Sequence, residues 1–180
     1  MSSSQDRKDK YSGGTSEWPL DGIRVVEFCH MVMGPTCGMI LGDLGADVIK
    51  VEPLNGDATR HLLHDGAGFF ASYNRNKRSI ALDLKSPEGL DAAKHLVLGA
   101  DVVIENFRPG ALEGLGLGYK ELSRKNPGLI YCALKGFLKG PYSHRKALDE
   151  VVQMMGGLAY MTGPEGRPLR AGASVIDIMG

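Results

Sequence analysis

Short apolar runs rich in β-branched residues alternate along the chain with segments of helical character. Each run is bounded by loop residues, and its length and composition are typical of a buried strand. The five runs cover residues 23–28, 47–52, 79–84, 101–107 and 129–137. Strands that alternate with helices usually form a parallel sheet with crossover connections, so the pattern predicts an α/β protein.

The segments between the predicted strands supply the crossover helices. Helical spacing occurs in residues 35–44, 86–98 and 119–125. Ser86 can cap the second helix, and Pro87 suits its first position. The third helix is expected to stop before Pro127. Together these elements predict a Rossmann-like parallel sheet with crossover helices.

The last part of the chain adds one helix and a strand that ends in an acidic residue. Residues 147–161 carry an apolar stripe at helical spacing, which the pair Gly156-Gly157 weakens. Residues 170–176 predict a strand that runs into Asp177. A carboxylate at such a strand end is expected to be exposed, directed at the ligand edge and close to backbone N–H groups. The plain alternative is that Asp177 only caps a helix.

The first 17 residues are polar and rich in Gly and Ser, without the apolar stretch of a secretory signal. We expect them to form a flexible tail before one α/β domain, residues 18–180. The longest uncharged stretch, residues 28–42, is short for a membrane span and contains Pro35. The cysteines Cys29, Cys37 and Cys132 form no C-x-x-C motif, which favours reduced thiols and a cytoplasmic location.

Charge is balanced overall and concentrated locally. Lys plus Arg and Asp plus Glu both number 21, so no net field attracts nucleic acid or a membrane. Basic residues nevertheless lie next to predicted strand ends, in residues 76–78, at Arg108 and Lys135, and in residues 144–146. Each alone is typical of a solvated surface, and residues 106–110 alone of an ordinary turn. Their recurrence where parallel sheets bind ligands favours a phosphorylated ligand.

The common phosphate-binding and hydrolase motifs are absent from the sequence. The Gly-rich run at residues 114–118 is G-x-G-x-G and follows no strand directly, and there is no G-x-x-x-x-G-K-[ST] loop. NAD and ATP binding are therefore disfavoured. The lack of a G-x-S-x-G motif disfavours a serine hydrolase in the same way.

Seven stretches in series resemble class III CoA-transferases, the family that includes formyl-CoA transferase and carnitine CoA-transferase. They are LDGIRVVEF (20–28), GPTCGMILGDLGADVIKVE (34–52), GDATR (56–60), NRNKRSIALDLKSPEG (74–89), ADVVIENFRPGALEGLGLGY (100–119), ALKGF (133–137) and ALDEVVQ (147–153). The resemblance implies that the chain is the incomplete large domain of a longer protein, cut before its small domain. It also implies an interlocked homodimer for the full-length form, and low activity with exposed apolar surface for residues 1–180 alone.

The resemblance implies a CoA site along the ends of the strands. It places residues 82–85 and 106–108 along the adenine and phosphates, and Lys146 near the pantetheine arm. The CoA contacts expected from it are Val32, Met33, Leu82, Asp83, Leu84, Lys85, Asn106, Phe107, Arg108, Lys146, Ala147, Leu148 and Asp149. No metal and no permanently bound cofactor is expected, because coenzyme A and acyl-CoA are substrates.

Asp177 matches the family's catalytic aspartate, which implies covalent carboxylate catalysis. In this mechanism Asp177 forms an anhydride with the acyl group and then a thioester with CoA. An acceptor carboxylic acid finally takes the CoA. A small dicarboxylate is the acceptor we favour.

Three further expectations concern the reaction type, the role of Asp149 and the substrates. Related α-methylacyl-CoA racemases carry a histidine where this chain has Leu148, and leucine cannot move a proton, so racemisation is disfavoured. Asp149 is expected to be a positioning or structural residue. Val32, Met33 and Pro53 depart from formyl-CoA transferase, which weighs against formate and oxalate. From another class, the chain could be a non-catalytic CoA-binding fragment or subunit.

Overall fold

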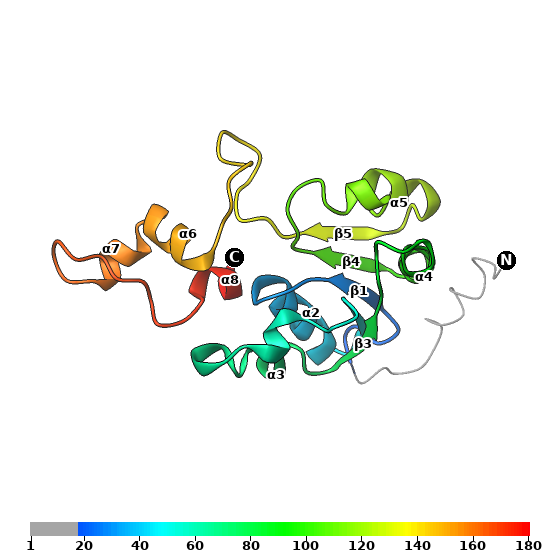
Figure 1. Cartoon of the computed structure of the whole chain (residues 1–180), viewed down its shortest axis with the longest axis horizontal. Helices are drawn as coiled ribbons and strands as arrows, with labels where there is room; N and C mark the ends of the chain where they lie inside the picture. Colours follow the sequence, from blue (N-terminus) through cyan, green and yellow to red (C-terminus); the bar gives the residue numbers. More distant parts are fainter. Residues whose placement is uncertain (1–17) are drawn as a thin grey trace.

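A computed structural model describes residues 18–180, so the predicted tail, residues 1–17, lies outside the described residues. Five strands form one sheet in the order β3-β2-β1-β4-β5, and all neighbouring strands are parallel (Figure 1). The strands are β1 (Arg24–Phe28), β2 (Asp47–Glu52), β3 (Lys77–Ala81), β4 (Val102–Glu105) and β5 (Ile130–Ala133). This order is that of a doubly wound α/β sheet, so the predicted fold class is confirmed.

The apolar runs predict the existence of the strands better than their ends. β3 spans Lys77–Ala81, whereas residues 79–84 were predicted, and β5 ends at Ala133, well before residue 137. After β3, Leu82 and Leu84 leave the sheet and pack against its core from a loop. Apolar residues in a loop that packs against the core extend the apolar run, so the sequence alone does not show where the strand ends.

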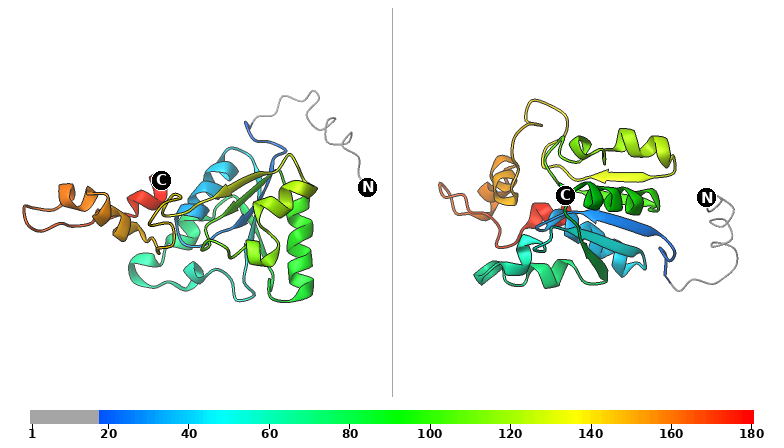
Figure 2. Two further views of the ribbon diagram at one scale, coloured as in Figure 1. Left: turned by 90° about the horizontal axis from the view of Figure 1, so that it is seen from above. Right: turned by 45° about the vertical axis from the view of Figure 1, so that its right-hand side comes forward.

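Helices cover both faces of the sheet. Figure 2 shows α2 (Met33–Asp43) on one face and α4 (Pro87–Leu98) on the other. α5 (Tyr119–Lys125) packs beside α4 and ends before Pro127, as predicted. Short helices occupy the connections, at η1 (Ala58–His61), η2 (His64–Gly66), α3 (Phe69–Tyr73) and η3 (Glu113–Leu115). Within residues 18–180, no helix is long and apolar enough to cross a membrane.

The start of α4 follows the capping pattern read from the sequence. The Ser86 hydroxyl accepts a hydrogen bond from the backbone N–H of Gly89 at 3.0 Å, and Pro87 occupies the first helical turn. A side-chain cap of this kind satisfies a donor that the helix leaves unpaired, and contributes about 1 kcal/mol. The boundary of α4 is therefore fixed locally.

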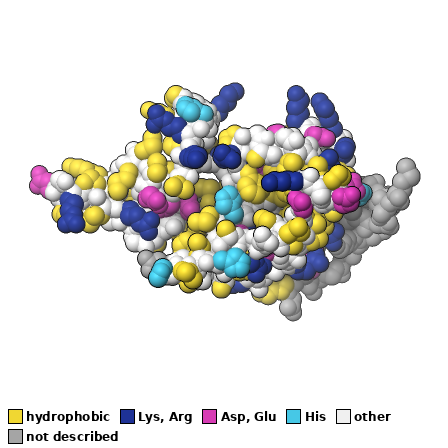
Figure 3. Space-filling view, viewed as in Figure 1, with side chains coloured by type: hydrophobic (Ala, Val, Ile, Leu, Met, Phe, Trp, Pro, Cys, Tyr) yellow, Lys and Arg dark blue, Asp and Glu magenta, His cyan; other side chains and the backbone are white. Residues whose placement is uncertain are grey.

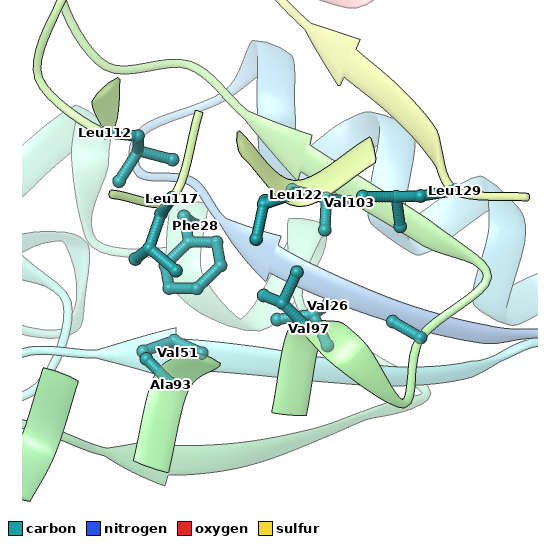
Figure 4. Packing of buried hydrophobic residues seen from close by; sticks show 11 residues of the cluster. Val26, Phe28, Val51, Ala93, Val97, Val103, Leu112, Leu117, Leu122 and Leu129 are labelled. Atoms are coloured by element: carbon teal, nitrogen blue, oxygen red, sulfur yellow. The ribbon is translucent and has the colours of Figure 1, made fainter. Parts of the chain in front are cut away.

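Alternate residues of the strands build two cores. Val26 and Val103 pack against Val97 of α4 and Leu122 of α5 in the larger cluster (Figure 4). On the opposite face, Val25, Val48 and Ile104 pack with Cys37 and Leu41 of α2. Because side chains along a strand alternate between faces, the short apolar runs serve both cores.

A buried ion network crosses the sheet beneath α2. Lys50 Nζ lies 3.2 Å from Glu27 Oε1 and 2.9 Å from Asp57 Oδ2, and donates to the Cys29 carbonyl at 2.7 Å. Lys77 Nζ lies 2.8 Å from the other Glu27 oxygen, Oε2. The two cations and two carboxylates balance one another, which a buried set of charges requires.

The sequence of α2 makes room for this network. A Cβ on Gly38 would lie 1.8 Å from Glu27 Oε2, and one on Gly34 would lie 2.4 Å from Cys29 Sγ. Any larger residue at these positions would push the helix away from the sheet. The two glycines therefore let α2 pack directly over buried charge.

Two cations placed at the ligand edge by the sequence analysis lie elsewhere. Lys77 is buried in the network, and Arg78 Nη2 pairs with Asp47 Oδ2 at 2.6 Å near the amino ends of β2 and β3. The prediction was wrong for both, because it assigned to the carboxyl edge a basic group that precedes a strand.

Residues 149–180 form an arm that extends from the sheet (Figure 1). The predicted helix 147–161 is divided into α6 (Asp149–Met155) and α7 (Leu158–Thr162), because Gly157 adopts a φ of +84°. The strand predicted at residues 170–176 is wrong. Asp177 instead lies inside α8 (Val175–Met179), whose first N–H groups are bound by Asp149 and not by a neighbouring strand.

Large apolar side chains are exposed along this arm. Tyr160 is 72% exposed, Met161 83% and Met179 80%. Figure 3 shows hydrophobic side chains gathered over the α6–α7 end of the molecule. The expectation of uncovered apolar surface is confirmed for this part of the chain.

The lowered pKa of Glu52 makes the stability of the fold depend on pH. Burial would raise its pKa, but Arg60, Ser79 and the Asp57 N–H all donate to the carboxylate and lower the pKa to about 2. A carboxylate with a lowered pKa stabilises the fold above its unfolded pKa of about 4.5 and loses that contribution as pH falls toward 2.

We therefore expect Glu52→Gln to flatten the pH dependence of the unfolding free energy between about pH 4.5 and 2. Arg60→Ala should lower stability at pH 7 by about 1–2 kcal/mol, a discounted value because the guanidinium is partly exposed. Urea unfolding across this pH range measures both effects. Arg78→Ala, at an exposed ion pair, is the control and should change stability by less than about 1 kcal/mol. An unchanged pH slope in Glu52→Gln would contradict the assignment.

Candidate functional site

A cavity of about 640 Å³ opens at the carboxyl ends of the strands. Its walls come from the loops after β1, β2 and β4 and from residues 134–148, which follow β5 and lead to the arm. They include Cys29, His30, Pro53, Asp57, Asn106, Phe107, Arg108, Lys135, Arg145, Lys146, Ala147 and Leu148. β1 and β4 are the strands at which the chain order of the sheet reverses. Open parallel sheets bind ligands at this position.

A second cavity, of about 440 Å³, adjoins the first. Both are lined by Val51, Glu52, Pro53 and Phe107, and the second adds Leu82, Asp83, Leu84 and Lys85. The structure thus brings together three groups that are far apart in the sequence: residues 82–85, 106–108 and 146–148. These groups hold most of the CoA contacts that the resemblance implied, and their binding role stays a prediction.

Asn106 shapes the wall between β1 and β4. Its Oδ1 accepts from the His30 N–H at 3.0 Å, and its Nδ2 donates to the His30 carbonyl at 2.8 Å. The His30 ring stacks on Phe107, with centroids 5.4 Å apart and planes 20° apart. Met31 follows with a φ of +64°, so this loop is held in an uncommon conformation. The Asn106 amide is committed to the protein, and Phe107 presents a fixed aromatic face.

The basic residues around the first cavity fall into two kinds. Lys135 Nζ lies 2.5 Å from Glu105 Oε1 and donates to the Phe107 carbonyl at 2.6 Å, so its charge is balanced. Arg108, Arg145 and Lys146 are exposed, and no ion pair joins any of them to another residue in the part of the chain that the structure describes. Arg145 lies over the Tyr142 ring, 4.7 Å from its centroid. Figure 3 shows Lys and Arg side chains beside the hollow between the arm and the sheet. Such groups suit phosphate oxygens.

Asp177 lies in the half-buried part of the arm. Burial is the main cause that raises the pKa of its carboxyl group, and the nearby carboxylates of Asp149 and Glu150 raise it further. Its side chain lines neither cavity. The expectation of an exposed carboxylate at the ligand edge is therefore wrong, because Asp177 lies in a helix beside Asp149. Its catalytic role stays a prediction.

Asp149 is buried, with 6% of its surface exposed, and its carboxylate faces α8. Asp149 Oδ1 accepts from the N–H groups of Ile176 at 2.8 Å and Asp177 at 3.2 Å. Asp149 lines neither cavity. The sequence analysis expected a positioning or structural residue and a CoA contact here, and both expectations stay predictions.

Val32 and Met33 lie apart from the cavity walls. Val32 is buried in the protein, and Met33 begins α2 with its Cε directed toward Gly180 at the end of α8. The structure places both where α2 meets the arm, and their part in CoA binding stays a prediction.

The sequence analysis missed residues that the structure makes prominent. Gln153 is fully buried and bonded to Asp149, and Glu52 and His30 line the first cavity. The four-residue spacing of Asp149 and Gln153, which places them on one face of a helix, was the only available signal for Gln153.

The three cysteines are free thiols in different surroundings. Cys29 is buried, and burial, together with Glu27, raises its pKa, so this thiol is held neutral. Cys37 and Cys132 are half-buried and free. Among residues 18–180, no group of three His, Cys, Asp or Glu side chains is arranged to hold a metal ion.

Comparison with known proteins gives a consistent result over nearly the whole described chain. The family model described as CoA-transferase family III matches residues 20–180. A succinate–glutarate CoA-transferase of Agrobacterium fabrum is 47% identical over 173 residues, which cover 89% of this chain and 43% of that protein. A formyl-CoA:oxalate CoA-transferase of Rhodopseudomonas palustris is 44% identical over 164 residues, covering 88% and 39%.

A solved structure agrees in fold as well as sequence. The crystal structure of a CaiB/BaiF family protein from Brucella suis superimposes with a TM-score of 0.84 and 44% identity, and covers 91% of this chain and 46% of that chain. The chain spans about two fifths of the length of these curated relatives. On the family model and these identities, the chain belongs to CoA-transferase family III.

Proposed function

We propose that the complete polypeptide containing residues 1–180 transfers CoA from an acyl-CoA thioester to a small carboxylic acid. The observation that carries this proposal is the cavity at the reversal of strand order, with Arg108 and Lys146 on its rim. Family membership gives the site its ligand class, because relatives of this chain are CoA-transferases by name.

CoA has three phosphate groups, an adenine ring and a long pantetheine arm, and each has a suitable surface here. Arg108 and Lys146 offer unpaired positive charge for phosphate. Phe107, between the two cavities, offers a flat face for a ring. The adjoining cavity, with residues 82–85, extends the site for the rest of the nucleotide.

The first half of the reaction moves the acyl group onto Asp177 and then replaces it with CoA. The Asp177 carboxylate attacks the thioester carbonyl carbon, the C–S bond breaks, and a mixed anhydride and a CoA thiolate are formed. The thiolate then attacks the Asp177 carbonyl of the anhydride. The donor leaves as a carboxylate, and an aspartyl-CoA thioester remains.

The second half repeats this exchange with the acceptor. The acceptor carboxylate attacks the aspartyl thioester, which gives a new anhydride and releases the thiolate. The thiolate attacks the acceptor's acyl carbon, so the product thioester forms and Asp177 is regenerated. Each intermediate is an activated acyl group, and the half-buried position of Asp177 limits its loss to water.

A small dicarboxylate is the acceptor we propose, because relatives are named for glutarate and oxalate. An acyl-CoA racemase is less well supported. Leu148 lines the cavity with 60% of its surface exposed, at the position where racemases of this kind have a histidine, and its side chain cannot exchange a proton.

Replacing the nucleophile tests the mechanism directly. Asp177→Ala in the complete polypeptide should lower kcat by at least about 10³-fold while CoA still binds. Treatment with hydroxylamine should convert Asp177 of the unmodified protein to a hydroxamate only after acyl-CoA has been added. Asp91→Ala, at an exposed position of α4, serves as the matched carboxylate control. Undiminished turnover in Asp177→Ala would remove this residue from the mechanism, whereas CoA binding without turnover in the unmodified protein would favour a non-catalytic CoA-binding role.

The basic rim predicts how affinity depends on charge. Arg108→Ala and Lys146→Ala should each raise the Kd for CoA by about 10-fold, since each removes a charge-assisted phosphate contact. Calorimetric titration at two salt concentrations measures this loss. Lys125→Ala at the end of α5 is the control, because it removes the same charge at a distance from the cavities. Equal affinities in all three variants would show that the cavity is not the phosphate site.

The raised pKa of Asp177 predicts an acid limb in the rate. Attack requires the ionised carboxylate, so kcat/KM should fall as pH drops through a pKa that lies above the usual 3.8. Glu150→Gln removes one carboxylate that raises this pKa, and should move the limb to lower pH. Initial rates between pH 4 and 8 test this shift. A movement toward higher pH would contradict it.

A further inference from the structure

We propose that Asp149 and Gln153 of α6 act together as positioning residues for Asp177, by holding residues 171–177 against one face of that helix. The inference rests on the proposed function, because it assumes that Asp177 is the reacting group. It concerns a buried glutamine that the chemistry itself does not require.

Gln153 uses both ends of its amide on the backbone of the segment that leads to Asp177. Its Oε1 accepts from the Ala171 N–H at 2.7 Å, and its Nε2 donates to the Ala173 carbonyl at 3.2 Å. The same Nε2 donates to Asp149 Oδ2. None of the Gln153 side chain is exposed, so water cannot reach its amide group. These hydrogen bonds therefore satisfy polar atoms that would otherwise be buried without a partner.

Asp149 continues the attachment one helical turn earlier. Its Oδ1 accepts hydrogen bonds from the N–H groups of Ile176 and Asp177, while its Oδ2 accepts one from Gln153 Nε2. Residues four apart lie on the same face of a helix, so the two side chains form one polar surface. That surface binds the chain at Ala171, Ala173, Ile176 and Asp177.

The held segment has few other restraints. The residues between α7 and α8 form no helix or strand, and α8 itself has only five residues, too few for a helix to be stable alone. Ile178 and Met179 of α8 are 40% and 80% exposed. Contacts with α2 and α6 keep α8 in place. One of the hydrogen bonds to α6 is made by the backbone N–H of Asp177 itself.

This attachment also creates the environment of the Asp177 carboxyl group. The Asp149 carboxylate is bonded to neutral N–H donors and carries a negative charge close to Asp177. A residue chosen only to cap α8 could be a neutral asparagine or serine. Asparagine at this position would keep an Oδ1 acceptor for the two N–H groups without the charge, although its NH2 group could not accept from Gln153 Nε2. It is therefore a probe of the contacts to α8.

The experiment compares four variants of the complete polypeptide by steady-state kinetics with an acyl-CoA donor. Gln153→Met and Asp149→Ala should lower kcat by about 10²-fold, because small displacements of a reacting group have effects of this size. KM for the acyl-CoA should stay within about 2-fold, because neither residue lines the cavities. Asp149→Asn should lose markedly less, about 10-fold at most, since it retains the acceptor. Met154→Ala, at a half-exposed position of the same helix, should match the parent protein.

Two further measurements separate positioning from general stability. Thermal unfolding reports whether each variant is folded, and the yield of the Asp177 hydroxamate per folded protein reports whether the nucleophile still reacts. Unchanged kcat in both Gln153→Met and Asp149→Ala would overturn the proposal. Equal losses in Asp149→Asn and Asp149→Ala would overturn it as well, and this comparison decides the question if Gln153→Met does not fold. Full activity in Asp177→Ala would instead reject Asp177 as the nucleophile of the proposed function.

Discussion

The ammonium group of Lys50, buried between Glu27 and Asp57, fixes the edge of the sheet on which the rest of the structure depends. Burial would lower its pKa, but the two carboxylates outweigh this effect and the net pKa is raised. Loss of one partner would leave a buried charge, at a cost of about 3–5 kcal/mol. The ends of β1 and β2 are thus tied to the loop that carries Asp57, and both Cys29 and Asp57 line the cavity.

A second buried polar group, around Asp149, attaches α8 to α6, and its charges are compensated differently. In the network around Lys50, each acid has a cation, whereas Asp149 has only neutral donors and lies beside another carboxyl group. Two carboxylates in one half-buried place destabilise each other's charged forms. Carboxyl groups with pKa values perturbed in this way cluster at functional sites, which agrees with the role proposed for Asp177.

The sequence predicted what local rules determine. The parallel sheet follows from the alternation of strands and helices, and the start of α4 follows from Ser86 and Pro87. Prediction from the sequence failed where a residue's structure depends on a partner that is distant in the sequence. Lys77 became buried because Glu27 lies on another strand, and residues 170–176 are not a strand because α6 binds their N–H and carbonyl groups in place of a neighbouring strand. In the candidate site, residues 82–85, 106–108 and 146–148 could be grouped only through the family resemblance.

A neutral chain can still present positive charge to a ligand if its acids are used internally. At the carboxyl edge, Glu27 and Asp57 bind Lys50, Glu52 binds Arg60, and Glu105 binds Lys135. Each of these acids is buried and already compensated. The cations that remain at the rim, Arg108, Arg145 and Lys146, therefore keep their field for the cavity. Selectivity for a phosphorylated ligand can thus arise from how charges are paired, without any excess of basic residues in the composition.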